Sequence, residues 1–206
     1  MCINELIKRA LTNDMWNPRY AYIAPTYKQA KSIIFDYLKL YAGVIPGTKF
    51  NEQELSCTFP NGSKIVLLGS ENPDSLRGNY YDGIICDEYA QINPRLFPEV
   101  IRPALSDRKG FCYFVGTPQG MSNDFYAKYQ HGLKDKTWYT KIAKASETGI
   151  VDEDELDAAL ELMGKNKYRQ EFECDWVAAL EGAIYGDVIE KIEDRKQVGR
   201  VPYDPT

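Results

Sequence analysis

Three short apolar runs, each followed at once by polar or turn-forming residues, constrain the fold of this chain more than any other feature. Segments with helical spacing separate the runs, and this alternation predicts an α/β fold with a mostly parallel sheet. The carboxyl ends of parallel strands meet at one edge of a sheet, where such folds bind ligands. We therefore expect three polar clusters to share one edge. The runs are 19–24, 83–86 and 111–115, and the clusters are Pro25-Thr26, Asp87-Glu88 and Gly116-Thr117-Pro118.

The spacing of apolar and turn-forming residues predicts the other elements. A β-hairpin is expected over 54–69, with a turn at 60–62, because Asn61 and Gly62 both tolerate the positive φ of a tight turn. A further strand is expected at 138–143. The predicted helices are one defined by Ile3, Leu6, Ile7, Ala10 and Leu11, one capped by Thr26 that runs through Gln29, Ile33, Ile34, Tyr37 and Leu38, and three at 95–105, 152–162 and 165–173.

The composition is that of a globular protein in water. The 206 residues, 44% of them hydrophobic and 27% charged, are enough to bury a core. Apolar runs fall far short of the ~20 residues of a membrane-spanning helix, and the start lacks a secretory signal pattern. Five cysteines without CxxC spacing indicate reduced thiols rather than a disulfide framework or a zinc site. A net charge of −5 argues against a surface that binds nucleic acid all over, but it allows a small basic patch.

Two adjacent carboxylates, Asp87 and Glu88, follow the apolar run at 83–86. In nucleotide hydrolysis one such carboxylate holds Mg²⁺, which keeps much of its water shell. The other polarises the water that attacks the γ-phosphate. The alternative interpretation is a pair of solvated acids at the start of a loop, and the residues alone leave both open.

The remaining candidate residues also have two interpretations. Gly116-Thr117-Pro118 is either a coupling element, whose hydroxyl senses the γ-phosphate, or an ordinary turn after a strand. Arg77, beside Gly78, is either an arginine finger that reaches a phosphate in a neighbouring subunit or a surface arginine. His131 is the only histidine, so a histidine-based triad is not expected.

Taken in order, the segments resemble the ATPase domain of phage terminase large subunits, the motors that package DNA into viral capsids. The stretch 82–90 (DGIICDEYA) looks like a Walker B strand with its catalytic glutamate, and 114–120 (FVGTPQG) resembles the coupling motif of the family. The resemblance covers most of the chain. Its other parts are 22–31 (YIAPTYKQAK), the hairpin, 75–78 (SLRG) and 168–176 (YRQEFECDW).

The resemblance implies a RecA-like P-loop NTPase fold of the ASCE type with an added β-hairpin. It implies that Asp87 holds the Mg²⁺ of Mg²⁺-ATP, that Thr117 contacts the nucleotide, and that Glu88 activates water. Arg77 falls where some members place an arginine finger that acts in trans, and 116–118 would couple hydrolysis to movement. The implied partners are double-stranded DNA, a portal protein, a terminase small subunit and a homo-oligomeric ring. The implied location is the cytoplasm of an infected or lysogenic bacterial host, without secretion or a membrane partner.

The sequence departs from the family pattern in two ways. No GxxxxGK[ST] phosphate-binding sequence occurs in the chain, and the first predicted helix begins at its first residues. The nuclease domain of the family is also not represented. We therefore expect a piece truncated at both ends, with a partial ATPase domain over 1–180, a linker over 181–206 and weak ATP hydrolysis by itself. The alternatives are a helicase-type ATPase fragment and a non-catalytic remnant or interaction module.

Overall fold

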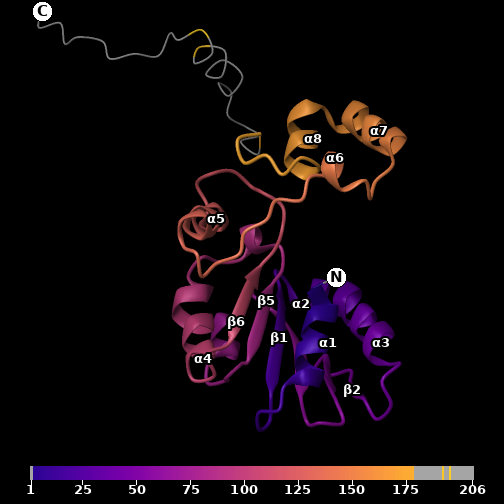
Figure 1. Cartoon of the computed structure of the whole chain (residues 1–206), viewed down its shortest axis with the longest axis vertical. Helices are drawn as coiled ribbons and strands as arrows, with labels where there is room; N and C mark the ends of the chain where they lie inside the picture. Colours follow the sequence, from indigo (N-terminus) through magenta and orange to yellow (C-terminus); the bar gives the residue numbers. More distant parts are fainter. Residues whose placement is uncertain (1, 179–191, 193–194, 196–206) are drawn as a thin grey trace, which may run out of the picture. The chain divides into compact units, whose positions relative to one another are not determined.

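The computed structural model of the chain describes residues 2–178 together with 192 and 195 (Figure 1). These residues divide into two compact units. Unit 1 comprises 1–117 and 123–129, and unit 2 comprises 118–122 and the residues from 130 onward. The predicted linker at 181–206 lies outside the described residues, apart from 192 and 195. Within the described part of the chain, no helix has the length and apolar character needed to cross a membrane.

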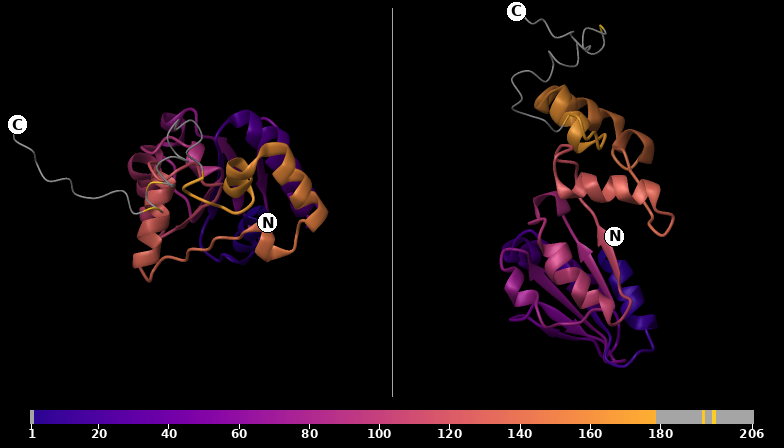
Figure 2. Two further views of the ribbon diagram at one scale, coloured as in Figure 1. Left: turned by 90° about the horizontal axis from the view of Figure 1, so that it is seen from above. Right: turned by 90° about the vertical axis from the view of Figure 1, so that its left-hand side faces the viewer.

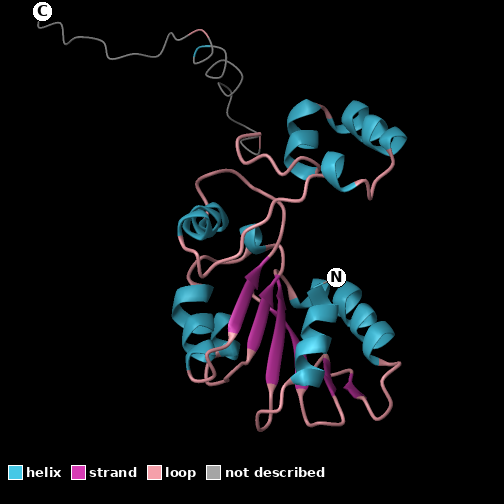
Figure 3. Ribbon diagram, in the orientation of Figure 1, coloured by secondary structure: helices cyan, strands magenta, loops and turns pink. Residues whose placement is uncertain are grey.

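Unit 1 is built on a six-stranded sheet in the order β2-β3-β4-β1-β5-β6 (Figure 3). The strands β4, β1, β5 and β6 are parallel neighbours, whereas β2 and β3 run antiparallel. The predicted α/β class and the hairpin are confirmed, and β2 was not predicted. The strands are β1 (Arg19–Ala24), β2 (Lys49–Asn51), β3 (Ser56–Thr58), β4 (Lys64–Gly69), β5 (Gly83–Cys86) and β6 (Phe111–Phe114).

Helices cover both faces of this sheet (Figure 2). Alternate residues of a strand point to opposite faces, so Tyr20 and Tyr22 join the core beneath α1 and α3, while Ala21 and Ile23 join the core beneath η4 and α4. The helices are α1 (Cys2–Thr12), α2 (Tyr27–Gln29), η1 (Ala30–Ile34), α3 (Phe35–Ala42), η2 (Pro73–Leu76), η3 (Tyr89–Gln91), η4 (Phe97–Ile101), α4 (Arg102–Ser106) and α5 (Asp124–Lys134), the last of which continues from unit 1 into unit 2.

The helix that follows β1 begins as predicted but buries a different face. Thr26 and Gln29 form a reciprocal capping box at its start. Ile33 and Tyr37, which were predicted to define the helix, are 51% and 49% exposed. The cause is the π-helical turn η1, because its extra residue rotates the following helix relative to a regular α-helix. Leu38 is buried as predicted, and the other buried positions are Ala30, Phe35 and Ala42.

The hairpin turn also differs in detail from the prediction. Gly62 adopts a positive φ of 85°, but Asn61 does not share this conformation. The turn closes with the Phe59 N–H donating to the Ser63 carbonyl oxygen at 2.9 Å. The Asn61 side chain instead donates to the carbonyl oxygen of Ala10 at 2.8 Å, near the end of α1. Asn61 therefore ties the hairpin to a helix, and its Oδ1 also accepts a hydrogen bond from the Ser63 N–H within the turn at 3.1 Å.

The described residues of unit 2 include the end of α5 and the helices α6 (Ala145–Thr148), α7 (Glu153–Met163) and α8 (Lys165–Glu171). The helices predicted at 152–162 and 165–173 are confirmed, with Gly164 between them, whereas α5 and α6 were not predicted. The strand predicted at 138–143 is wrong, because these residues have no regular secondary structure. Thr140 packs on Gly132 of α5, where an added Cβ would lie 2.4 Å from its methyl carbon. Packing against a helix therefore replaces strand pairing here.

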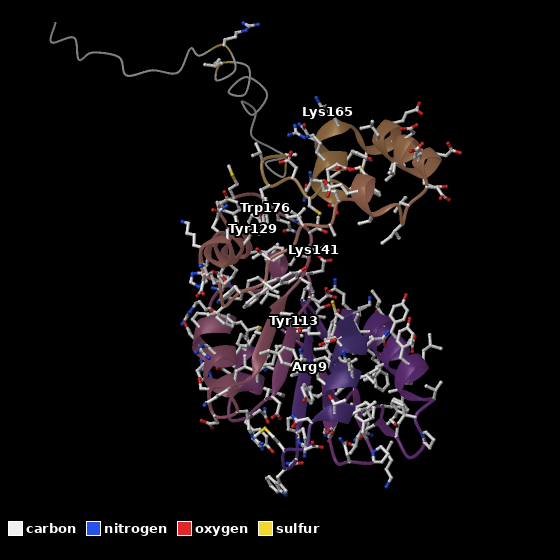
Figure 4. All side chains as sticks on the ribbon, viewed as in Figure 1. Arg9, Tyr113, Tyr129, Lys141, Lys165 and Trp176 are labelled. Carbon is white, nitrogen blue, oxygen red and sulfur yellow. The ribbon has the colours of Figure 1, made fainter. Side chains whose placement is uncertain are left out.

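An apolar strand, β6, lies at one edge of the sheet in the described residues. Its four residues are apolar and half-buried. The Arg9 guanidinium lies over the Phe111 ring, 5.2 Å from its centroid, and next to Tyr113 (Figure 4). The Phe111 N–H bonds to the Asp82 carbonyl oxygen and the Val115 N–H to that of Cys86, so the intervening Cys112 N–H points to the outer edge. An apolar edge without charge or proline is a template for strand pairing.

We expect this chain to self-associate through the outer edge of β6. Cys112→Pro removes an outward N–H while it leaves the hydrogen bonds to β5 in place, so it should lower the associated fraction. Cys112→Ala removes the thiol but keeps the N–H, and it should associate like the native chain. Sedimentation velocity over a concentration series measures the fraction. A native chain that stays monomeric throughout, or equal association of the two variants, would contradict this expectation.

Candidate functional site

The carboxyl ends of four parallel strands, β4, β1, β5 and β6, meet at one edge of the sheet in unit 1. The clusters that the sequence predicted at one edge are thus brought together, except that Pro118 belongs to unit 2. The end of β4 was not predicted to join them, although it also closes an apolar run. We call the residues at these four strand ends the rim, which comprises 25–27, 69–71, 87–89 and 115–117.

The ends of β4 and β1 are tied together by short hydrogen bonds. The Ser70 N–H donates to the Ala24 carbonyl oxygen and its hydroxyl to the Pro25 carbonyl oxygen, both at 2.9 Å. The Tyr27 N–H donates to Oε1 of Glu71 at 2.7 Å. An added Cβ on Gly69 would lie 2.3 Å from the Tyr27 nitrogen, so only glycine allows this close approach. These contacts fix the start of α2 at the rim.

Asp87 is anchored to β1 by its backbone and by its side chain. Its N–H donates to the Ile23 carbonyl oxygen at 2.8 Å, and its Oδ2 accepts a hydrogen bond from the Tyr22 hydroxyl at 2.6 Å. Burial, followed by the hydrogen bond to Asp87, raises the pKa of Tyr22 far above its ordinary value, so the phenol stays a donor. Burial also raises the pKa of the Cys2 thiol, and the charge of Asp87 adds to this rise.

The helix α1 begins at the same edge of the sheet as the rim (Figure 1). Cys2 is the first residue of α1, which runs from this edge of the sheet toward the opposite one (Figure 1). The N-terminus of a helix carries a partial positive charge and free N–H groups, which favour anions. The start of α1 and the carboxylate of Asp87 therefore face the same region of unit 1.

Glu88 adopts a left-handed backbone conformation, with a φ of 47°. This region is costly for a residue other than glycine, by roughly 1–2 kcal/mol. The conformation is held by a hydrogen bond from the Tyr89 N–H to the Val115 carbonyl oxygen at 2.9 Å. Gly116, with a φ of 147°, lies so close that an added Cβ would be 3.0 Å from the Glu88 Cα. The residues that follow β6 therefore pack closely against the backbone of Glu88.

Tyr89 connects this turn to the start of α5. Its hydroxyl donates to Oδ2 of Asp124 at 2.6 Å, and its ring packs edge-on against Phe114 and Phe125, with centroids 4.6 and 5.9 Å apart. Burial, followed by the bond to Asp124, raises the pKa of Tyr89 far above its ordinary value. Asp124 also pairs with Lys128 at 3.2 Å. No local pattern predicts this contact, because Tyr89 and Asp124 are 35 positions apart.

Arg77 is not brought to the carboxylates of Asp87 and Glu88. Among the described residues, its polar contacts are with Asp74, at 2.9 Å from Nε, and with Glu99, whose Oε2 lies 3.6 Å from Nη2. Its side chain is 51% exposed. Arg77 therefore lies on the surface of unit 1, held by acids of its own chain.

The segment 116–118 spans the point where the chain passes from unit 1 to unit 2. Gly116 and the half-buried Thr117 belong to unit 1, and Pro118 belongs to unit 2. In unit 2 the carbonyl oxygen of Pro118 accepts a buried hydrogen bond from Nε2 of Gln170 on α8 at 3.0 Å. Gln170 lies in the stretch 168–176 that carried the resemblance, but it was not predicted as a functional residue.

The carboxylates of the rim suit a metal ion that binds few protein ligands. Asp87 and Glu88 are both half-buried, so neither residue is enclosed in the core. In the part of the chain that the structure describes, no three His, Cys, Asp or Glu side chains are grouped to hold a metal. Mg²⁺ commonly binds through one or two carboxylates together with phosphates and water. Asp87 fits such an ion, whereas Zn²⁺ in structural sites takes four protein ligands.

Replacement of Gly116 by alanine should loosen the turn at Glu88. The new Cβ meets backbone atoms that cannot move aside, and the positive φ adds strain, so we expect a loss of about 1–3 kcal/mol in unfolding free energy. Gly149→Ala is the matched control, since Gly149 has a positive φ of 61° but open space around it. Urea denaturation measures both variants. A Gly116→Ala variant no less stable than Gly149→Ala would contradict the close packing at Glu88.

Comparison with known proteins gives the family. A family model described as the N-terminal part of the T4likevirus-type terminase large subunit matches residues 4–190. The large terminase subunit of Escherichia phage T5 is 28% identical over 189 residues, which are 87% of this chain and 42% of that protein. The chain thus spans less than half the length of this curated relative.

Solved structures show the same fold. The ATPase domain of the Thermus phage P74-26 large terminase has a TM-score of 0.60 and 24% identity, over 85% of this chain and 80% of that one. The large terminase of another thermophilic bacteriophage, solved in complex with ADP, has a TM-score of 0.69 and 15% identity, over 85% and 44%. The predicted RecA-like fold is confirmed, and a helicase is not favoured. Because the family model covers most of the sequence, the chain belongs to the terminase large subunit family.

Proposed function

We propose that this chain forms the nucleotide-hydrolysing part of a viral DNA-packaging motor, with the rim of unit 1 as its ATP site. The observation that carries the proposal is the arrangement around Asp87 and Glu88. Both follow β5 at the carboxyl edge of a parallel sheet, and α1 starts at the same edge (Figure 1). The ADP complex of the thermophilic-phage large terminase supports a nucleotide as the ligand.

Asp87 is the residue that would hold Mg²⁺ of a bound Mg²⁺-ATP. Its backbone is anchored through Ile23 and its carboxylate through Tyr22, and the residue is only half-buried. When bound, Mg²⁺ neutralises charge on the phosphate oxygens. Thr117, at the end of β6, is the other rim residue whose hydroxyl we assign to the nucleotide.

Glu88 is the residue that would orient and polarise the attacking water. Its left-handed backbone turns the chain directly after Asp87, so that two adjacent residues serve different roles. The closely packed Gly116 and the hydrogen bond from Tyr89 to Val115 hold this turn. A fixed base position lowers the entropic cost of the attack.

The segment 116–118 would transmit the nucleotide state of the rim to unit 2. Gly116 contacts the backbone of Glu88, and the next two residues lead from unit 1 into unit 2. Gln170 holds Pro118 within unit 2. A shift of the Glu88 turn would therefore move the point at which the chain enters unit 2, and this is the coupling that we assign to these three residues.

Double-stranded DNA, a portal protein, a terminase small subunit and other copies of the chain in a ring are the partners that we propose, in the cytoplasm of a bacterial host. They follow from the family, whose members package DNA. In such a ring Arg77 would act on the nucleotide of a neighbouring subunit, because its exposed side chain contacts Asp74 and Glu99 rather than its own Asp87 or Glu88. Asp74 and Glu99 would hold it until then.

Nucleotide binding tests the assignment of Asp87 and Glu88. We expect the chain to bind a fluorescent ADP analogue weakly and to hydrolyse ATP slowly, since no GxxxxGK[ST] sequence is present. Asp87→Asn should lower the Mg²⁺-dependent affinity about tenfold. Glu88→Gln should keep the affinity and lower any turnover by about 10²-fold or more. Glu153→Gln, on the first turn of α7, is the control. Rapid turnover, or affinity that is indifferent to Asp87, would contradict the proposal.

Mixing of variants tests the trans role of Arg77. In an assembly that hydrolyses ATP, Arg77→Ala and Glu88→Gln should each abolish most turnover. An equimolar mixture should recover part of it, because some interfaces then combine an intact Arg77 with an intact Glu88. Turnover is measured by phosphate release. A mixture as inactive as the two variants alone would count against action in trans.

A further inference from the structure

We propose that Tyr22 is a positioning residue for Asp87, whose hydroxyl fixes one carboxylate oxygen and thereby the orientation that Asp87 presents at the rim. This inference rests on the proposed function of Asp87 as the residue that holds Mg²⁺. It assigns a role to a buried side chain of β1 that was not predicted as part of the site.

The geometry gives each oxygen of Asp87 its own donor. The Tyr22 hydroxyl donates to Oδ2 at 2.6 Å, and the Glu88 N–H donates to Oδ1 at 3.1 Å. The backbone is fixed as well, since the Asp87 N–H donates to the Ile23 carbonyl oxygen at 2.8 Å. The carboxylate therefore has little freedom to rotate about its side-chain bonds.

The position of Tyr22 makes this donor rigid. Tyr22 is 5% exposed and packs in the core between the sheet and α1. It lies beside Ile85 in the register of β1 and β5, two positions before Asp87 along the chain. A phenol is protonated at neutral pH, so toward a carboxylate it acts as a donor. Hydrogen bonds from a neutral donor to a charged acceptor are shorter and stronger than neutral ones.

An oriented carboxylate matters for Mg²⁺ in particular. This ion demands nearly ideal octahedral geometry, so a ligand that rotates freely binds it less well. Side chains that hydrogen-bond a metal ligand typically contribute 10–100-fold to metal affinity. We therefore expect Tyr22 to raise the affinity for a divalent ion without touching that ion.

Tyr20 offers a matched control on the same strand and the same face of the sheet. It is 2% exposed and packs in the same core as Tyr22. Its hydroxyl accepts a hydrogen bond from Nδ2 of Asn13 at 2.8 Å and donates to the Arg9 carbonyl oxygen at 3.1 Å. Tyr20→Phe thus removes a buried, hydrogen-bonded hydroxyl near the start of β1, remote from Asp87.

The test measures Mn²⁺ binding to the full chain in the presence of ADP, by electron paramagnetic resonance of the free ion. Tyr22→Phe should raise the dissociation constant about 10–100-fold, whereas Tyr20→Phe should leave it within about twofold. Thermal unfolding of both variants shows whether they lose similar stability. Equal affinity of Tyr22→Phe and the native chain, or an equal loss in both variants, would overturn the inference.

Asp87→Asn separates this inference from the proposed function. If Asp87→Asn lowers the affinity and Tyr22→Phe does not, only the role of Tyr22 fails. If Asp87→Asn leaves Mn²⁺ binding unchanged, or the native chain does not bind the ion, the metal role of Asp87 fails and the inference with it. The double variant should bind no more weakly than Asp87→Asn alone, because the hydroxyl acts through that carboxylate. A further loss in the double variant would also overturn it.

Discussion

The pairing of β5 between β1 and β6 is the constraint on which the site depends. All four residues of β5 are buried, and parallel neighbours on both sides fix the height at which the strand ends. Asp87 therefore emerges at the same level as the end of β1, and Glu88 at the level of Gly116. Burial of apolar strands, rather than any contact between the polar residues themselves, brings the carboxylates to the rim.

The backbone is locally strained at two residues of the rim. Glu88 takes a left-handed conformation, and Gly116 occupies a φ that disfavours side chains. Both are held by the backbone of the β6 end and by the Tyr89–Asp124 hydrogen bond at the start of α5. Strained backbone that neighbouring structure over-determines is typical of functional sites. Here the strain lies between the proposed water-activating residue and the segment that leads into unit 2.

Much of this arrangement could be predicted from the sequence. The bounds of β1 and β5 were predicted correctly, because each is an apolar run that ends sharply at polar or turn-forming residues. The capping box of Thr26 follows from local hydrogen-bonding chemistry. The shared edge of three polar clusters followed from parallel topology, which local patterns indicate through alternating strands and helices.

The failures have physical causes as well. The π turn η1 shifted the buried face of the next helix, and spacing alone does not reveal an extra residue in a turn. Residues 138–143 have the composition of a strand but pack on α5 instead. The bonds of Tyr22 to Asp87 and Tyr89 to Asp124 join residues 65 and 35 positions apart, and only the folded chain brings them together.

The rim of unit 1 is proposed to bind a metal–nucleotide complex at Asp87. Paramagnetic broadening of backbone amide signals by Mn²⁺-ADP tests it most directly, since it reports weak binding residue by residue. The signals of Thr26, Asp87 and Gly116 should broaden first, while those of Arg19 and the buried Asp82, at the opposite ends of β1 and β5, should stay sharp. Broadening centred on Asp82, or confined to unit 2, would contradict it.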